Sequence, residues 1–302
     1  MLGIWDFDAN GRRLGSLTFP GPSHKLCHMQ NLSIGMFDSG IGGLTVLKEV
    51  RSLLPREDII YLGDTARVPY GNKSPYTVTR YALETALFLV AKGIKALIIA
   101  CNTSSALALN ILKKKLPIPV FGVIDPAAAA AAKRTTSKKI GVIGTKATVK
   151  SMAYERAVRR IDRHVQVLSQ ACPLFVPIAE EGWEDSEVAH LVVRKYLSPF
   201  HSSGIDVLVM GCTHYPILQR TIREELGPDV FIVNTGRETA TEVQKLLGAR
   251  GLLKDSGRGG SSYFVTDSPE SFSEVGSRFL GEPISNVTLV KNLDLKDFLL
   301  ST

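Results

Sequence analysis

Short apolar runs alternate with longer amphipathic segments over the first half of the chain. The runs stand at 34–40 (IGMFDSG), 58–64 (DIIYLGD), 92–103 (KGIKALIIACNT) and 119–123 (PVFGV). Segments with helical spacing of apolar residues lie between them, at 42–54 (GGLTVLKEVRSLL), 76–93 (YTVTRYALETALFLVAKG) and 104–116 (SSALALNILKKKL). Short Val/Ile/Leu-rich runs separated by amphipathic helices predict parallel strands joined by crossover helices, and therefore an α/β fold.

The second half of the chain repeats this pattern. KGIKALIIACNT (92–103) aligns without a gap with SGIDVLVMGCTH (203–214), an offset of 111. IGMFDSG and DIIYLGD align with IGVIGTK (140–146) and HVQVLSQ (164–170) at an offset of 106, and PVFGV aligns with DVFIV (229–233) at 110. Four apolar runs per half, in the same order, predict a duplicated unit of about 100 residues.

The two ends of the chain lie outside the repeat. Residues 1–30 are rich in turn formers (DANGRRLGS, PGPSHK), so we expect a flexible extension in which Cys27 is an incidental thiol. The C-terminal part should hold a helix at 238–250, a Gly/Ser-rich link at 256–262 and one αβ-like piece at 268–293. We expect this part to pack back on the first half.

Composition narrows the class of protein. A chain of 302 residues with 44% hydrophobic and 22% charged residues has room for two soluble domains. Its most apolar stretch is broken by Lys92 and Lys95, which argues against a membrane span. Asp6 and Asp8 argue against a secretory signal, so we expect a cytoplasmic protein. Four cysteines without a CxxC pair predict neither a disulfide framework nor a metal site.

The net charge of +7 is concentrated in one window. Residues 133–163 contain ten Lys or Arg and two acidic residues, so the rest of the chain sums to about −1. Arg156, Arg160 and Arg163 have helical spacing, which is typical of a solvated helix face. Because no aromatic residues are interleaved, a nucleic-acid partner is not favoured.

Chemistry-bearing residues cluster where the predicted strands end. Parallel sheets bind ligands beyond the carboxyl ends of their strands. The residues at those ends are Asp38, Ser39, Asp64, Cys101 to Thr103, Gly144, Thr145 and Cys212 to His214. One buried cysteine after a strand is usually structural. Two cysteines at matched positions, each followed by polar side chains, instead favour a paired function.

Two thiols that face one cleft from two related halves suit the inversion of a tetrahedral carbon. One group removes a proton from one face, and the other returns a proton to the opposite face. A thiol has an unperturbed pKa near 8.5, so modest changes of environment suit it to either role. Asp38 could orient Cys101, and His214 could stabilise the thiolate of Cys212. Backbone N–H groups of DSGIGG (38–43) could hold substrate carboxylates.

Other chemistries fit less well. DSGIGGL lacks the GxGxxG spacing of a dinucleotide site, and no strong context for a pyridoxal-phosphate lysine is visible. A Cys–His hydrolase would use Cys212 and His214 but leave Cys101 without a role.

Six segments, in order, resemble the cofactor-independent glutamate racemases of peptidoglycan synthesis, over about residues 32–250. The segments are FDSGIGGLTVLKEV, YLGDTARVPYG, ACNTSSAL, GVIGTKATVKSMAYE, ACPLFVPIAEEG and GCTHYPIL. The resemblance implies two flavodoxin-like domains, 31–125 plus 235–302 and 126–234, with the active site between them. It also implies a homodimer without a cofactor.

The resemblance also implies roles for individual residues. Cys101 and Cys212 would be the catalytic acid/bases, assisted by Asp38, His214 and Glu180, with Glu181 as a rival to Glu180. The substrate amino acid would be bound by Asp38, Ser39, Tyr70, Gly71, Asn102, Thr103, Thr213 and His214. Two alternatives stay open: an aspartate racemase or related Cys-pair isomerase, and a non-catalytic binding protein with a basic face.

Overall fold

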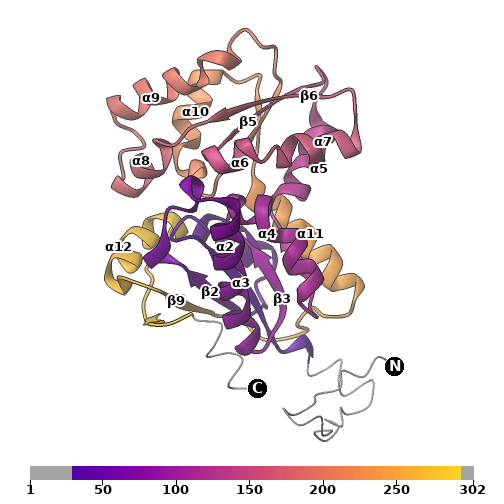
Figure 1. Cartoon of the computed structure of the whole chain (residues 1–302), viewed down its shortest axis with the longest axis vertical. Helices are drawn as coiled ribbons and strands as arrows, with labels where there is room; N and C mark the ends of the chain where they lie inside the picture. Colours follow the sequence, from indigo (N-terminus) through magenta and orange to yellow (C-terminus); the bar gives the residue numbers. More distant parts are fainter. Residues whose placement is uncertain (1–28, 294–302) are drawn as a thin grey trace, which may run out of the picture.

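The computed structural model describes residues 29–293, so Cys27 and nearly all of the predicted N-terminal extension lie outside the described residues. Two lobes are stacked along the long axis of the molecule, each with a parallel sheet covered by helices (Figure 1). The sheet of the first lobe has the strand order β10-β9-β2-β1-β3-β4, and the sheet of the second has β6-β5-β7-β8.

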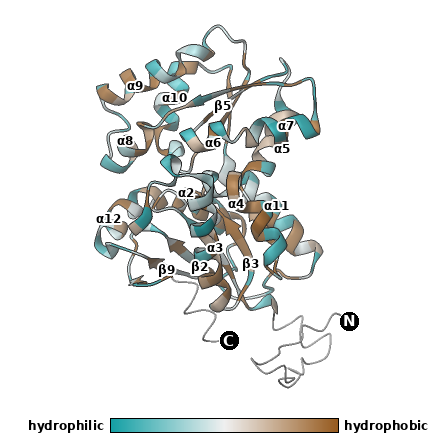
Figure 2. Ribbon diagram, viewed as in Figure 1, coloured by the Kyte–Doolittle hydropathy of each residue, from teal (hydrophilic) through white to brown (hydrophobic). Residues whose placement is uncertain are grey.

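The first lobe begins with four strands and their crossover helices. These elements are β1 (Ser33–Asp38), α2 (Leu44–Leu53), β2 (Ile59–Gly63), the 3₁₀ turns η1 (Thr65–Arg67) and η2 (Tyr70–Asn72), α3 (Pro75–Ala91), β3 (Ile94–Ile99), α4 (Asn102–Lys115) and β4 (Val120–Gly122). All six residues of β3 are buried, because helices cover both faces of its sheet. Figure 2 shows the hydrophobic strands of this lobe between amphipathic helices. The strands and helices predicted at 34–123 are confirmed.

The second lobe is built in the same way. Its elements are α5 (Ile124–Arg134), β5 (Lys139–Gly144), α6 (Lys146–Lys150), α7 (Ala153–Ile161), β6 (Gln166–Ala171), α8 (Phe175–Glu181), α9 (Glu187–Leu197), η3 (Ser198–Phe200), β7 (Val207–Gly211), η4 (Tyr215–Leu218), α10 (Gln219–Leu226) and β8 (Phe231–Val233). Helix α7 ends at Ile161, so Arg163 does not share its face with Arg156 and Arg160 as the spacing predicted.

The register of the two sheets confirms the duplication. In the first lobe Gly35 pairs with Leu97, and in the second Gly141 pairs with Leu208. These four residues are related by the same offsets, 106 and 111, that align the sequences. The order β2-β1-β3-β4 also recurs as β6-β5-β7-β8.

The C-terminal part returns to the first lobe. It consists of α11 (Thr235–Ala249), β9 (Ser261–Val265), α12 (Pro269–Leu280) and β10 (Val287–Leu289). Strand β9 was not predicted, and the Gly/Ser-rich link was expected to include its first two residues. Ser261 and Ser262 are extended because β9 pairs with β2, from Ile59 onward. Helix α11 packs on α2 of the first lobe and on α5 of the second.

Candidate active site

A cavity of about 340 Å³ lies where the carboxyl ends of both sheets meet. Nine of the sequence-predicted site residues line it: Ser39, Tyr70, Gly71, Cys101, Asn102, Thr103, Cys212, Thr213 and His214. Val68, Pro69, Asn72, Thr145, Lys146, Pro173, Leu174, Val176 and Pro177 complete the wall. Asp38 and Glu180 do not line the cavity, but they contact the wall residues Thr213 and His214, respectively. Both lobes contribute, so the wall of the cavity contains one cysteine from each lobe.

Cys101 follows β3 and is the N-cap of α4. Its Sγ accepts a hydrogen bond from the backbone N–H of Ser104 (3.4 Å) and lies 3.9 Å from the Oγ of Ser39. Burial and the nearby Asp38 carboxylate raise the pKa of Cys101 to about 12. This environment favours the neutral thiol of Cys101 over its thiolate.

Cys212 follows β7 at the matching place in the second lobe. Its Sγ lies 3.9 Å from Nδ1 of His214, and Nε2 of His214 lies 2.9 Å from Oε1 of Glu180. Burial lowers the pKa of His214, but the hydrogen bonds to Cys212 and Glu180 outweigh it and raise the pKa to about 10. Of the two candidate glutamates, Glu180 therefore contacts His214, whereas Glu181 is exposed. Cys212 accordingly has a cationic neighbour.

Asp38 ends β1 and is fully buried. Its Oδ1 accepts a hydrogen bond from the N–H of Gly40 (3.0 Å), and its Oδ2 accepts one from the Oγ1 of Thr213 (3.3 Å). Burial raises the pKa of Asp38, although the His214 charge opposes this effect. Asp38 therefore ties the first lobe to the loop that carries Cys212, and it acts on Cys101 through its charge.

Asn102 and Thr103, at the start of α4, are held by the second lobe. Tyr154 donates a hydrogen bond to Oδ1 of Asn102 (2.6 Å), which leaves Nδ2 of Asn102 buried without a partner in the described structure. Thr103 Oγ1 lies 2.9 Å from Oγ1 of Thr145, which caps α6. The free amide N–H group is a donor available to a carboxylate in the cavity.

Sequence reasoning gave no role to Tyr154, and it noted Thr145 only as a strand end. Both stand in the segment GVIGTKATVKSMAYE, but nothing in that segment indicates that they contact α4.

Two glycines allow the lobes to approach each other at the cavity. A Cβ on Gly42 would lie 2.3 Å from Oγ1 of Thr213, and one on Gly71 would lie 2.7 Å from Cβ of Thr145. Tyr70, beside Gly71, is held by a hydrogen bond from its hydroxyl to the buried carboxylate of Asp64.

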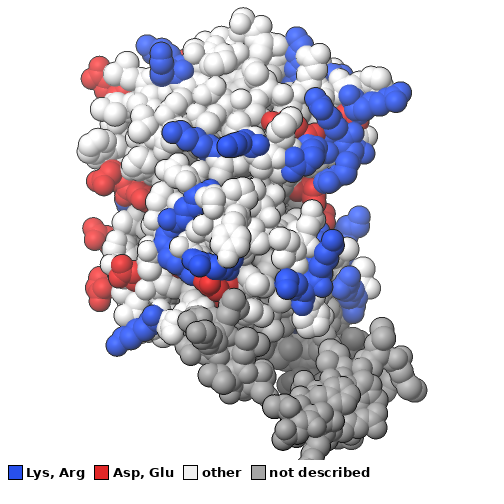
Figure 3. Space-filling model, in the orientation of Figure 1, with Lys and Arg blue, Asp and Glu red and all other residues white. Residues whose placement is uncertain are grey.

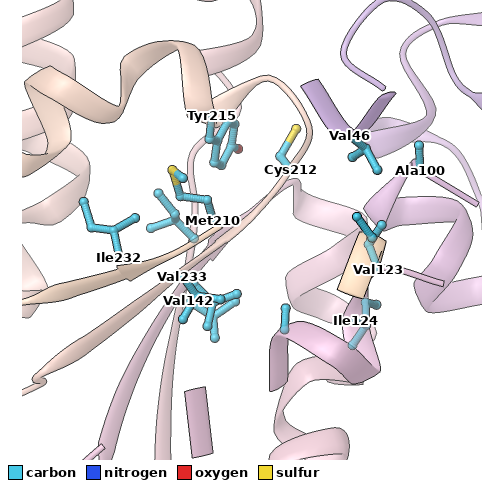
Figure 4. Packing of buried hydrophobic residues seen from close by; sticks show 14 of the residues in the cluster. Val46, Ala100, Val123, Ile124, Val142, Met210, Cys212, Tyr215, Ile232 and Val233 are labelled. Atoms are coloured by element: carbon cyan, nitrogen blue, oxygen red, sulfur yellow. The ribbon is translucent and has the colours of Figure 1, made fainter. Parts of the chain in front are cut away.

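The interior beneath the cysteines is apolar. Figure 4 shows Cys212 next to Met210 and Tyr215 of its own lobe, with Val46 and Ala100 of the first lobe across the boundary. Between residues 29 and 293 no group of three or more His, Cys, Asp or Glu side chains could hold a metal ion. Over the same residues, no helix is both long enough and apolar enough to cross a membrane.

Comparison with known proteins identifies the family of this chain. The family model for Asp/Glu/hydantoin racemases matches residues 42–243. A glutamate racemase of Geobacter metallireducens is 56% identical over 256 residues, which cover 84% of this chain and 95% of that protein. The chain belongs to the Asp/Glu/hydantoin racemase family.

Solved structures of racemases share the fold. A glutamate racemase isoform of Bacillus anthracis superposes with a TM-score of 0.84 at 42% identity, covering 88% of this chain and 98% of its own. The glutamate racemase of Francisella tularensis, solved with D-glutamate, gives a TM-score of 0.83 at 40% identity, covering 88% and 99%. The predicted two-lobed fold and the predicted racemase family are both confirmed.

Proposed function

We propose that this protein is a cofactor-independent glutamate racemase that interconverts L- and D-glutamate and supplies D-glutamate for peptidoglycan synthesis. The observation that carries the proposal is the pair of cysteines from matched strand ends, one from each lobe, on one cavity. The similarity to glutamate racemases over most of both chains supports glutamate as the substrate.

The reaction is a proton transfer at Cα. With D-glutamate, the Cys101 thiolate removes the Cα proton, and the Cys212 thiol delivers its own proton to the opposite face. The product is L-glutamate, with a Cys101 thiol and a Cys212 thiolate. The reverse reaction starts from that state, so each cysteine is base in one direction and acid in the other.

Neighbouring groups give the two thiols different electrostatic surroundings. The Glu180–His214 pair places a cation beside Cys212, which favours its thiolate when that thiol has given up its proton. The Asp38 carboxylate acts in the opposite sense on Cys101. Negative charge that develops on the substrate needs electrostatic stabilisation, and hydrogen-bond donors that line the cavity can supply it.

We assign substrate binding to side chains and backbone at the cavity wall. The Nδ2 group of Asn102 is a buried donor without a hydrogen-bond partner among the described residues. The remaining assigned residues are Asp38, Ser39, Tyr70, Gly71, Thr103, Thr213 and His214, of which only Asp38 does not line the cavity. We further propose that the chain forms a cytoplasmic homodimer, and that its domains are 31–125 plus 235–302 and 126–234.

Proton exchange at Cα tests this function. D- and L-glutamate are incubated with the protein in heavy water, with a chelator and no added cofactor, and deuterium at Cα is followed by NMR. We expect both enantiomers to exchange and interconvert. Turnover of aspartate but not glutamate would favour the aspartate racemase alternative. No exchange with either amino acid would favour a binding protein, whose ligand affinity should depend strongly on salt.

A further inference from the structure

A second cavity of about 690 Å³ opens beside the active-site cavity. The two cavities share Gly71, Asn72 and Lys146 in their walls. The wall of the second cavity also contains Lys73, Ser74, Pro75, Leu107, Ala147, Lys150 and Ser151. We call this cavity the entrance cavity, because it adjoins the active site at the boundary between the lobes.

The wall of the entrance cavity carries positive charge only. Among residues 29–293 it contains Lys73, Lys146 and Lys150 and no Asp or Glu, and the same residues contribute no Asp or Glu to the wall of the active-site cavity. In the described part of the chain, the lysines that form ion pairs are Lys95, Lys138 and Lys254. Among the described residues, no Asp or Glu forms an ion pair with any of the three entrance lysines.

The backbone brings the three lysines together from both lobes. Lys146 and Lys150 are the first and last residues of α6, one helical turn apart, so they lie on the same face. Lys73 follows η2 of the first lobe, which packs against α6. Both α6 and α3 lack acidic residues in their first turn. Figure 3 shows Lys and Arg gathered on this face, over α6 and over the start of α3.

We propose that Lys73, Lys146 and Lys150 form an electrostatic entrance that concentrates a dicarboxylate amino acid at the active site. The inference rests on the proposed function and adds a specificity device to it. Glutamate has two carboxylates and one ammonium group at neutral pH, so its net charge is negative and the cluster attracts it. Lys146 lines both cavities, so it is the last of the three lysines that a substrate passes on its way to the active site. Two lysines of the basic window 133–163 thereby acquire a role.

The test replaces the three lysines together. The triple variant Lys73→Gln, Lys146→Gln, Lys150→Gln should raise KM for D-glutamate about tenfold at low ionic strength, with a smaller change in kcat. Salt should raise the KM of the wild-type protein toward that of the variant, because salt screens exposed charges. The corresponding triple Lys→Arg variant keeps the charge and should keep the wild-type KM.

A matched control removes the same charge elsewhere. Lys113, Lys114 and Lys115 are exposed in the last turn of α4, at the end of the helix far from Cys101. Their triple Lys→Gln variant should retain the wild-type KM and salt dependence. An equal rise in KM in this control would assign the effect to net charge and overturn the proposal. An unchanged KM in the entrance variant would overturn it as well.

Calorimetric titration with D-glutamate separates this inference from the proposed function. Wild-type protein that binds D-glutamate in a salt-dependent way but does not exchange Cα protons would refute the racemase function alone. Wild-type protein that racemises, with equal affinity in wild type and entrance variant, would refute the entrance alone.

Discussion

The ends of β3 and β7 are the same place in two copies of one unit, yet their surroundings carry opposite charge. Cys101 has the Asp38 carboxylate nearby, which together with burial raises its pKa to about 12. Cys212 has His214, whose pKa is raised to about 10, so this imidazole is protonated at neutral pH. The backbone frame is repeated, and the electrostatic environment is not.

This difference has a chemical use. Two thiols in identical surroundings would have the same affinity for a proton, so neither would be protonated in preference to the other before substrate binds. Burial and the Asp38 carboxylate favour the neutral thiol of Cys101, whereas Cys212 has the protonated imidazole of His214 beside it, so the two members of the acid/base pair differ in their electrostatic surroundings. Duplication supplied the two positions, and divergence at two matched places, Asp38 against Gly144 and Thr103 against His214, supplied the difference.

Loss of either thiol should have the largest effect. Cys101→Ala and Cys212→Ala each remove one half of the acid/base pair, so racemisation should fall on the order of 10³-fold in both directions. Cys172→Ala is the matched control, because Cys172 is also buried but does not line the cavity. Racemisation is measured by circular dichroism from each enantiomer. A mutant of either cavity cysteine that stays within a few-fold of wild type would refute the two-base assignment.

A substrate with a leaving group at Cβ distinguishes the role of Cys101 from that of Cys212. Elimination needs proton removal only, so a variant that has lost one thiol still processes the enantiomer served by the other. Cys101→Ser should eliminate from the L-isomer and Cys212→Ser from the D-isomer. If both variants process the same enantiomer, the assigned directions are wrong.

The sequence predicts the repeated part of the molecule better than the unrepeated part. Strand order and register follow from apolar runs that recur at fixed offsets, and these place both cysteines at strand ends. Strand β9 was missed, because Ser261 and Ser262 are extended only through pairing with β2. The contacts of Tyr154 with Asn102 and of Gly42 with Thr213 join residues from different lobes, which no local pattern records.

Removal of the Asp38 charge should alter the reactivity of Cys101 more than that of Cys212. In Asp38→Asn the pKa of Cys101 should fall from about 12 toward its ordinary value, because an anion no longer opposes the thiolate. Alkylation of Cys101 should then occur at lower pH, as measured by mass spectrometry of its peptide, with little change at Cys212. Racemisation should fall about 100-fold, because the Asp38 carboxylate no longer assists proton transfer by Cys101. An unchanged alkylation profile at Cys101 would contradict the electrostatic role.

Two neighbouring glutamates, Glu180 and Glu181, allow a matched test of the environment of His214. Because the pKa of His214 is raised from 6.5 to about 10, its protonation stabilises the fold fully below pH 6.5, and this contribution is lost as pH rises through about 10. Glu180→Gln removes one cause of the raised pKa, so the alkaline fall in Tm and in kcat/KM should move about one pH unit lower. Glu181→Gln should leave both profiles in place, since Glu181 is exposed. A shift with Glu181→Gln instead would identify the rival carboxylate as the partner.

The smallest expected effect is that of chelators and carbonyl reagents, which should leave the rate unchanged. Cys101 and Cys212 line the cavity from different lobes, and among residues 29–293 no group of three or more His, Cys, Asp or Glu side chains could hold a metal ion. If the groups around Cys101 and Cys212 instead bound one metal ion, metal binding would explain their opposite charges. The contrast between the two cysteine environments would then have no acid/base role. Racemisation is therefore followed with EDTA, and separately with hydroxylamine, at several substrate concentrations. Loss of activity with EDTA that an added metal restores would contradict the two-thiol mechanism, whereas loss with hydroxylamine would indicate a carbonyl cofactor.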